Sequence, residues 1–406
     1  MAEAHRVSPT TATVPAALST GTTPLAAVRE RFPGIGGDGW ARLDGPAGTQ
    51  MVDVAIDAMA DFMRSGDNAN HGGVFRAAEA TDELVASARA AAARLLGGAP
   101  EGIAFGPSMS ALTMRFAATV GRPLDAGDEI VCTRLDHDAN VSPWVIAAER
   151  AGAVVRFADP EPDTLELPAS AVDAVLSERT RWVAVTAASN AVGTVPDLPG
   201  IVAAAHAAGA QVYVDAVHAT PHRAIDVEAL HCDALACSAY KWFGPHTSVL
   251  WVRPELFEEL RPDKLRPSPE EIPDRFELGT LPFESLAGLR AAAEFMLSLD
   301  RDELRAHEDA LLAQMLDGLR AIDGVTVHGA ARDRAPTIMF SVDGRSAIDV
   351  ARALAAEQIA VWHGNYYALE LSRHLGLEPD GAVRAGAVAY TDQEDVRRLV
   401  DAVARL

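Results

Sequence analysis

The feature that most constrains the fold is a regular alternation of short apolar runs with helical patterns from about residue 50 onward. An amphipathic segment over 49–65 comes first. Strands are then predicted where the apolar runs lie, at 102–106, 128–133, 154–158, 182–186, 211–217, 234–238 and 248–252. Runs that are apolar along their whole length are typical of strands buried on both faces. We therefore predict an α/β fold whose large domain holds a mostly parallel sheet between layers of helices.

The pattern changes after residue 260, which indicates a second, smaller α+β domain. The stretch 261–275 is rich in proline and charge and precedes a long helical pattern over 283–322. Shorter patterns follow, with strands at 325–328, 337–342, 359–362 and 383–390, a helix from Ala347 and a terminal helix. We predict a flexible leader over 1–25, a large domain over 26–270 and a small C-terminal domain over 271–406. Residues 26–50 are expected to be able to pack on the small domain.

The charge and the cysteine content limit which classes of binding partner and which cellular compartment we expect. The chain has 35 Lys and Arg against 57 Asp and Glu, a net charge of −22. This argues against binding to nucleic acid or an anionic membrane, since both need a basic face. The sequence contains no run of about 18 apolar residues, so we predict no membrane span. The three cysteines (Cys132, Cys232 and Cys237) have no CxxC spacing, which fits a reducing cytoplasm.

A lysine and an aspartate carry the strongest chemical signal. Only two of the basic residues are lysines, and one of them, Lys241, stands between the apolar run 234–238 and a Gly-Pro turn. A desolvated lysine can lose its proton and attack an aldehyde, whereas arginine cannot. Asp215 lies in the upstream strand segment, 26 residues before Lys241. Because an acid there can keep a pyridine nitrogen protonated, the pair predicts pyridoxal phosphate as cofactor.

Further polar residues follow predicted strands, at the sheet edge where ligands of open α/β folds bind. The segment Gly106-Pro107-Ser108-Met109 precedes a helix, whose free N–H groups can bind phosphate, although Ser108 would also serve as a plain helix cap. Ser238 is a second candidate phosphate ligand. His137 suits stacking on the cofactor ring, with a solvated loop histidine as the alternative. Asn190 is a candidate contact of the cofactor's phenolic oxygen and of the substrate.

The sequence offers one candidate clamp for a substrate carboxylate and no metal site. Arg384, on the predicted strand 383–390, presents a fork of donors that matches a carboxylate, and a salt bridge between domains is an equally good interpretation. His218 and His222 are four residues apart, but Pro221 opposes the helix that a zinc pair would need.

These motifs together resemble the class V aminotransferase group of fold-type I pyridoxal phosphate enzymes, and most closely the cysteine desulfurases. Asp215-Ala216-Val217-His218 resembles the family's Asp-x-x-Gln/His element, which implies that His218 bonds the phenolic oxygen. Ser238-Ala239-Tyr240-Lys241 resembles its Ser-x-His-Lys element, with Tyr240 in place of a phosphate-binding histidine. The resemblance implies the fold-type I architecture, with the cofactor in the large domain.

The resemblance extends from about Leu43 to the C-terminus. Asp136-His137-Asp138-Ala139-Asn140 resembles the segment with the ring-stacking histidine, which implies that role for His137. Phe276-Glu277-Leu278-Gly279-Thr280 resembles the segment that reaches the phosphate of a neighbouring subunit. Gly279 and Thr280 are therefore implied to bind cofactor in a homodimer with shared active sites. Val383-Arg384-Ala385-Gly386 resembles the carboxylate-binding Arg-x-Ser, with glycine in place of serine.

One departure from the family decides the expected chemistry. Desulfurases carry a persulfide-forming cysteine in a loop like Arg-x-Gly-His-His-Cys-Ala. The corresponding stretch 362–368 reads Trp-His-Gly-Asn-Tyr-Tyr-Ala, with tyrosine where the thiol belongs. The chain's cysteines lie in or near predicted sheet strands, where buried thiols are usually inert. True desulfuration through an enzyme persulfide is therefore not expected.

We predict an enzyme that acts on a small amino acid through a Cα carbanion, with Lys241 as the base. β-Elimination of a cysteine-like substrate ranks first because the relatives act on sulfur amino acids, and Tyr366 or Tyr367 is a candidate to protonate the leaving group. An aminotransferase and an amino-acid epimerase are the alternatives on the same scaffold. A non-catalytic scaffold or partner protein is the alternative of another class, and the retained Lys241, Asp215 and Arg384 argue against it.

Overall fold

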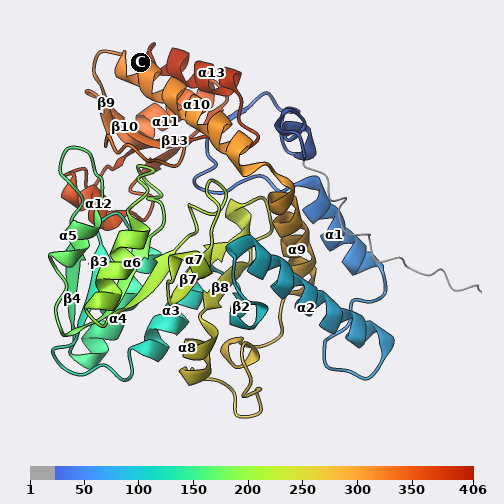
Figure 1. The fold of residues 1–406 in the computed structure, drawn as a ribbon. Helices are drawn as coiled ribbons and strands as arrows, with labels where there is room; N and C mark the ends of the chain where they lie inside the picture. The colour runs from blue at the N-terminus through green and yellow to red at the C-terminus, as the bar shows by residue number, and fades with distance from the viewer. Residues whose placement is uncertain (1–22) are drawn as a thin grey trace, which may run out of the picture.

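The computed structural model describes residues 23–406, which fold into a larger α/β unit and a smaller α+β unit (Figure 1). Most of the predicted leader, residues 1–22, lies outside the described residues. None of the helices in the described part of the chain is long and apolar enough to cross a membrane.

The larger unit is built on a seven-stranded sheet in the order β2-β8-β7-β6-β5-β3-β4. Its strands are β2 (Ile103–Gly106), β3 (Glu129–Thr133), β4 (Val154–Ala158), β5 (Thr180–Thr186), β6 (Gln211–Asp215), β7 (Ala234–Ser238) and β8 (Ser248–Val252). β4, β3, β5, β6 and β7 run parallel, and β8 is antiparallel to both β7 and β2. All residues of β2, β3, β7 and β8 are buried, which explains their continuous apolar runs. The predicted mostly parallel sheet is confirmed.

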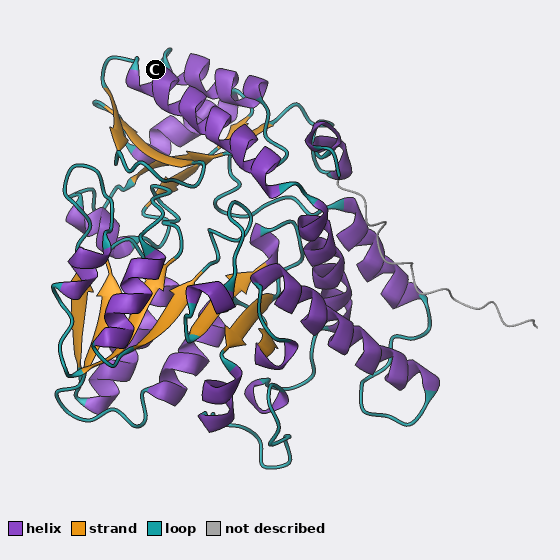
Figure 2. Cartoon of the chain, viewed as in Figure 1, coloured by secondary structure: helices purple, strands orange, loops and turns teal. Residues whose placement is uncertain are grey.

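Helices cover both faces of this sheet (Figure 2). One face packs against α3 (Met109–Val120) and α4 (Ser142–Ala151), the other against α2 (Arg76–Leu96), α6 (Leu198–Ala207) and α9 (Phe283–Ser298). Successive strand residues alternate between the two cores, so that Ile130 and Cys132 face one layer while Val131 faces the other. Further helices complete the unit: α1 (Asp53–Arg64), α5 (Ala169–Asp173), α7 (Val227–Leu230) and α8 (Pro254–Glu259).

The smaller unit has a four-stranded antiparallel sheet in the order β12-β13-β10-β9. The strands are β9 (Val325–His328), β10 (Thr337–Val342), β12 (Trp362–Gly364) and β13 (Ala382–Gly386). Its helices are α10 (Arg301–Arg320), α11 (Ala347–Ala356), α12 (Leu369–His374) and α13 (Gln393–Val403). The N-terminal segment joins this unit through β1 (Ala41–Arg42), which pairs in parallel with β11 (Ile359–Ala360).

Several predicted bounds are wrong, each for a local reason. The helical pattern over 283–322 forms two helices, α9 and α10, because the Asp300 side chain accepts hydrogen bonds from the backbone N–H groups of Asp302 and Glu303 and starts a new helix. The predicted strand 359–362 divides into β11 and β12, which belong to different sheets. The predicted strand 383–390 ends at Gly386.

The helix α9 packs against α1 and α2, beside the large sheet. This packing favours a domain boundary between α9 and α10 over the predicted one at residue 270, and we propose the later position.

Candidate active site

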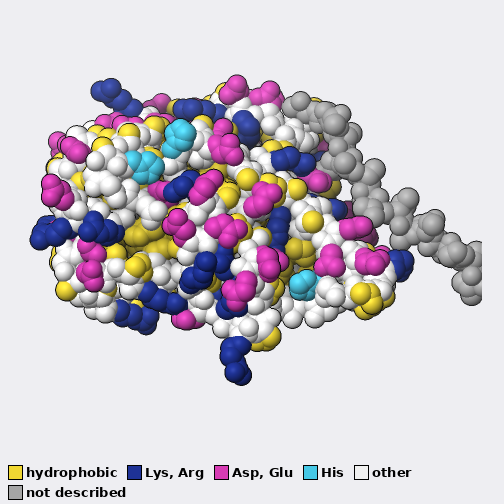
Figure 3. Space-filling view, turned by 60° about the horizontal axis from the view of Figure 1, so that its bottom comes forward, with side chains coloured by type: hydrophobic (Ala, Val, Ile, Leu, Met, Phe, Trp, Pro, Cys, Tyr) yellow, Lys and Arg dark blue, Asp and Glu magenta, His cyan; other side chains and the backbone are white. Residues whose placement is uncertain are grey.

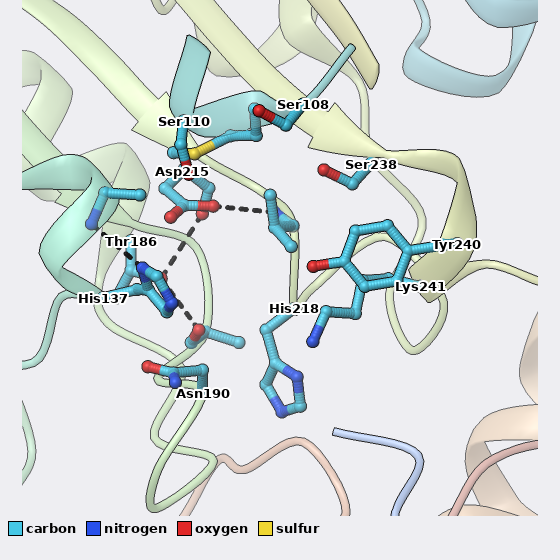
Figure 4. Close-up of a pocket in the computed structure, with 14 residues that line it drawn as sticks. Ser108, Ser110, His137, Thr186, Asn190, Asp215, His218, Ser238, Tyr240 and Lys241 are labelled. Atoms are coloured by element: carbon cyan, nitrogen blue, oxygen red, sulfur yellow. Dashed lines mark hydrogen bonds between the residues drawn. The ribbon is translucent and has the colours of Figure 1, made fainter. Parts of the chain in front are cut away.

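A pocket opens where β5, β6 and β7 end, at the carboxyl edge of the large sheet (Figure 4). Nine of the residues singled out from the sequence line it: Ser108, Met109, His137, Asn190, Asp215, His218, Ser238, Tyr240 and Lys241. Sequence reasoning missed five other lining residues: Ser110, Ala139, Thr186, Ala188 and Val217. These five lie within two residues of predicted site residues or at a strand end, and position relative to the strand ends was the signal that could have identified them.

Lys241 enters the pocket from the short turn Ala239–Lys241 that follows β7. Its Nζ donates hydrogen bonds to the carbonyl oxygens of Pro46 and Ala47, the latter at 2.9 Å. Burial lowers the pKa of the Lys241 amine to about 7, helped by the positive charge of Arg384 and opposed by Asp215. A large fraction of this amine is therefore unprotonated near neutral pH, as a nucleophile or a base requires.

Asp215 is the last residue of β6, and its side chain is buried. One carboxylate oxygen accepts a hydrogen bond of 2.9 Å from the backbone N–H of Val217. Burial raises the pKa of Asp215 to about 6, while that hydrogen bond and Lys241 act in the opposite direction. A buried acid with one incompletely satisfied carboxylate is suited to pair with a protonated ring nitrogen.

His137 follows β3, and two contacts hold its imidazole in place. Its Nδ1 accepts a hydrogen bond of 2.9 Å from the backbone N–H of Ala139. Its ring stacks on that of Tyr367, with centroids 5.3 Å apart and planes 23° from parallel. Burial lowers the pKa of His137 to about 4, with further lowering by Lys241 and Arg384. The ring is therefore neutral at pH 7 and presents a flat face, as stacking on a planar ligand requires.

Hydroxyl groups gather at the opposite end of the pocket, around the start of α3. Ser108 caps this helix by accepting a hydrogen bond from the backbone N–H of Ala111, so the capping interpretation holds and does not exclude a phosphate contact. Ser238 shares a hydrogen bond of 2.8 Å with Ser248. The Tyr240 ring stacks on His246, with centroids 5.0 Å apart, and Figure 4 shows its hydroxyl directed into the pocket.

His218 connects the pocket to the smaller unit. Its Nε2 lies 2.9 Å from the hydroxyl of Thr337 on β10, and its ring packs edge-to-face against His222. The Nδ1 of His222 in turn lies 3.0 Å from a carboxylate oxygen of Glu308 on α10. His218 and His222 therefore contact Thr337 and Glu308, which both belong to the smaller unit.

Arg384 on β13 is buried and does not line the pocket. Its NH1 donates a hydrogen bond of 2.9 Å to the backbone carbonyl of Asn190, and its guanidinium lies 4.5 Å from the centre of the Tyr366 ring. Burial lowers the pKa of Arg384 to about 10, so the group stays charged at pH 7. No carboxylate within residues 23–406 forms an ion pair with Arg384, so the salt-bridge interpretation finds no partner in that part of the chain.

Gly279 and Thr280 do not line the pocket of their own chain. Both are exposed, in a segment anchored by the buried carboxylate of Glu277, which accepts hydrogen bonds from Arg89 and from the backbone N–H of Phe105. The segment is therefore fixed at its buried end, and Gly279 and Thr280 lie on the surface.

The residues present fit pyridoxal phosphate. A buried amine, a buried acid and a flat neutral imidazole surround one cavity, with a helix N-terminus and hydroxyl groups at its end. The Oδ1 of Asn190 is buried without a hydrogen-bond partner, while its Nδ2 donates to the Tyr366 carbonyl at 3.0 Å. An unpaired buried acceptor is costly unless a ligand supplies a donor.

Comparison with known proteins gives consistent matches over nearly the whole chain. The family model described as "Aminotransferase class-V" matches residues 41–399. The cysteine desulfurase of Salmonella agona (strain SL483) is 32% identical over 405 residues, which cover 95% of this chain and 98% of the relative. The apo cysteine desulfurase of Thermococcus onnurineus NA1 superposes with a TM-score of 0.89 at 26% identity, and the cysteine desulfurase CsdA of Escherichia coli with 0.86 at 26%. Each of these two alignments covers 95% of this chain and 98% of the solved one.

Proposed function

The chain belongs to the class V aminotransferase family of pyridoxal phosphate enzymes, and from this premise we propose that it is a C–S lyase for a cysteine-like amino acid. It would release sulfur as free sulfide or thiol, without first taking it onto an enzyme cysteine. The observation that carries this proposal is the pair of tyrosines at 366–367, in the loop where the desulfurase pattern has its cysteine.

No cysteine elsewhere in the chain is placed to replace the missing thiol. Cys132, Cys232 and Cys237 are all buried, and none lines the pocket. Burial raises the pKa of each thiol, that of Cys237 to about 12. The thiolate is the nucleophilic form of cysteine, so these side chains are poor acceptors of sulfur from a substrate.

The side chains of the pocket are suited to elimination. Bound pyridoxal phosphate supplies an electron sink for the charge left at Cα when its proton departs. The unprotonated Lys241 amine is the base that takes this proton, and Asp215 holds the positive charge that draws electrons into the ring. Arg384 binds the substrate carboxylate. The Cβ–S bond then breaks with its electron pair on sulfur, which takes up a proton as it leaves.

The two tyrosine hydroxyls differ in their availability as the proton donor to sulfur. The Tyr366 hydroxyl donates to the backbone carbonyl of Ala382 and is buried, so we exclude it from this role. Tyr367 is 70% exposed, and its hydroxyl remains the candidate of the two. Unchanged turnover in the Tyr367→Phe variant would exclude Tyr367 as the proton donor as well.

The experiment that tests the proposal measures sulfide and pyruvate released from L-cysteine with no added reductant. A lyase should form both in equal amounts, with or without prior treatment by iodoacetamide, because its chemistry uses no cysteine. The Lys241→Ala variant is the control, and it should lose both the turnover and the visible absorption band of the bound cofactor.

Other outcomes identify other reactions. Alanine together with a 32 Da adduct on a cysteine peptide would show true desulfuration and overturn the proposal. Keto acid formed without sulfide would indicate amino-group transfer, and loss of optical rotation would indicate epimerisation. A protein whose spectrum responds to no amino acid would support the scaffold alternative.

We also infer that two copies share their active sites, through the anchored segment that ends in Gly279 and Thr280. Leu278 beside them is 58% exposed. On the face shown in Figure 3, acidic and basic side chains are interspersed and apolar ones gather in patches between them, with no continuous basic surface. That face favours a protein partner over a nucleic acid.

A further inference from the structure

Two consecutive tyrosines of the smaller unit contact residues that line the pocket, and both have an unusual backbone conformation. Tyr366 and Tyr367 have φ angles of 52° and 61°, in the left-handed region that bulky residues rarely adopt. The segment starts at Gly364, also at positive φ, directly against Gly381, the residue before β13. Strained conformations of this kind persist only where the surroundings enforce them, and they gather at functional sites.

The backbone of this tyrosine pair is hydrogen-bonded to two loops of the larger unit. The Tyr366 carbonyl accepts a hydrogen bond of 3.0 Å from Nδ2 of Asn190, after β5. The Tyr367 carbonyl accepts one of 2.6 Å from the backbone N–H of Asp138, after β3. Both loops also supply pocket residues, so the tyrosine pair is joined to the walls of the pocket.

The Tyr366 ring fixes the guanidinium of Arg384. The two groups lie 4.5 Å apart, within the range of a cation–π interaction, and the ring cannot turn away because its hydroxyl is held by Ala382. On another side, Arg384 donates to the carbonyl of Asn190. The remaining guanidinium donors are thus set in a fixed orientation before a substrate arrives.

The Tyr367 ring acts in the same way on His137. The near-parallel stack covers one face of the imidazole, while Nδ1 is held by the N–H of Ala139. Since the tyrosine is 70% exposed, its own burial contributes little to packing. The stack leaves the histidine ring one orientation in which to meet a planar ligand.

We propose that Tyr366 and Tyr367 are positioning residues that adapt the site to a small α-amino acid with a free carboxylate. Tyr366 orients Arg384 toward that carboxylate, and Tyr367 orients His137 toward the cofactor. The inference rests on the proposed function for its substrate class and extends it by naming what selects the substrate. Preorganised groups lose less entropy when they bind, so both affinity and selectivity gain.

The test for Tyr366 uses two ligands without a leaving group, L-alanine and L-alaninamide, titrated against the cofactor-loaded enzyme by its visible spectrum. Wild type should prefer the carboxylate. Tyr366→Leu should reduce the ratio of the two dissociation constants by about tenfold, the order of a desolvated cation–π contact, whereas Tyr366→Phe should keep most of it. An unchanged ratio in Tyr366→Leu would overturn the proposal for this residue.

The control for this comparison is Phe75→Leu, which removes an exposed aromatic side chain just before α2 and should leave the ratio unchanged. If Tyr366→Leu does not fold, Tyr366→Met supplies the same comparison, since it keeps bulk without an aromatic face. Because neither ligand can undergo elimination, the outcome is independent of whether the enzyme is a lyase.

The test for Tyr367 needs no cofactor. Hydrogen–deuterium exchange at the imidazole C2 position, followed by mass spectrometry, reports the accessibility and pKa of each histidine separately. In Tyr367→Ala the His137 exchange should accelerate several-fold, while Tyr367→Phe, which keeps the stacked ring, should match wild type. Equal exchange of His137 in Tyr367→Ala and wild type would show that the ring does not hold the histidine.

Discussion

At the scale of single residues, Lys241 makes the stability of the cofactor-free protein depend on pH. Its amine has a pKa of about 7 in the folded protein, below the ordinary value of 10.5. Between these two values the unfolded chain binds the proton that the folded chain has released, so stability rises as pH rises. The full penalty, on the order of a few kcal/mol, is present below pH 7.

Urea unfolding of cofactor-free protein at pH 6.5 and 9.5 measures this contribution. Wild type should gain more stability than Lys241→Met over this range, because the variant lacks the titrating amine. If the free energy of unfolding changes equally in wild type and Lys241→Met, the amine is not desolvated.

Asp215 supports a prediction about catalysis at the same scale. Replacing it with asparagine removes the negative charge beside the ring nitrogen, and turnover should fall by about a hundredfold or more, as when a preorganised charge is lost. The cofactor should still bind and show its colour, since Lys241 remains. The measurement is kcat with the visible spectrum of the same samples, and the exposed Asp323→Asn is the control that should behave as wild type. Full turnover in Asp215→Asn would exclude the pairing of Asp215 with the ring nitrogen.

At the scale of elements, the tyrosine pair depends on the close approach of two backbone segments. Gly381 has a φ of 65°, and a Cβ placed there would overlap the backbone of Gly364. Gly381→Ala should therefore displace the loop before Tyr366 without changing either tyrosine. We expect a loss of preference for L-alanine over L-alaninamide, together with faster backbone exchange in the 362–368 peptide.

The matched control is Gly344→Ala, at a glycine that also has positive φ but has nothing within 4 Å of an added Cβ. It carries a similar backbone cost and should leave the ligand preference intact. If Gly381→Ala and Gly344→Ala show the same preference for L-alanine over L-alaninamide, the position of the loop before Tyr366 does not determine which ligand is selected.

At the scale of the whole molecule, shared sites predict complementation between two inactive variants. Lys241→Ala removes the amine, and Thr280→Asp places a negative charge where the neighbour's phosphate would lie. A mixed dimer then has one site with both defects and one with neither, so a random mixture should recover about a quarter of wild-type activity. The mixed species can be isolated with two different affinity tags and assayed directly.

A mixture of Lys241→Ala with Lys241→Met is the control, since both sites of that dimer lack the amine. It should show no recovery. If Lys241→Ala with Thr280→Asp also shows none, while each variant retains its dimeric mass, the segment at 276–280 does not serve the neighbouring site.

The sequence by itself was sufficient to predict the parallel sheet and most of the pocket. Buried strands such as β7 and β8 are apolar along their whole length, and site residues such as Asp215 and Lys241 stand where those strands end. Local pattern carries this information because strand burial and the position of a ligand at a sheet edge follow from chain order. The long helix α2 escaped prediction although its buried residues, among them Leu84, Ala88 and Leu95, recur at helical spacing, because many of the residues on that face are alanines.

Only the tertiary structure decided what lies between the two units. The hydrogen bond between His218 and Thr337 and the one that Arg384 donates to Asn190 join residues 119 and 194 positions apart. The carbonyls of Pro46 and Ala47 reach Lys241 from almost two hundred residues away. No local pattern encodes such contacts, because they depend on how the packed elements dock. The chain order thus identified the chemistry of the pocket, and the docking of the two units determined which side chains hold it in position.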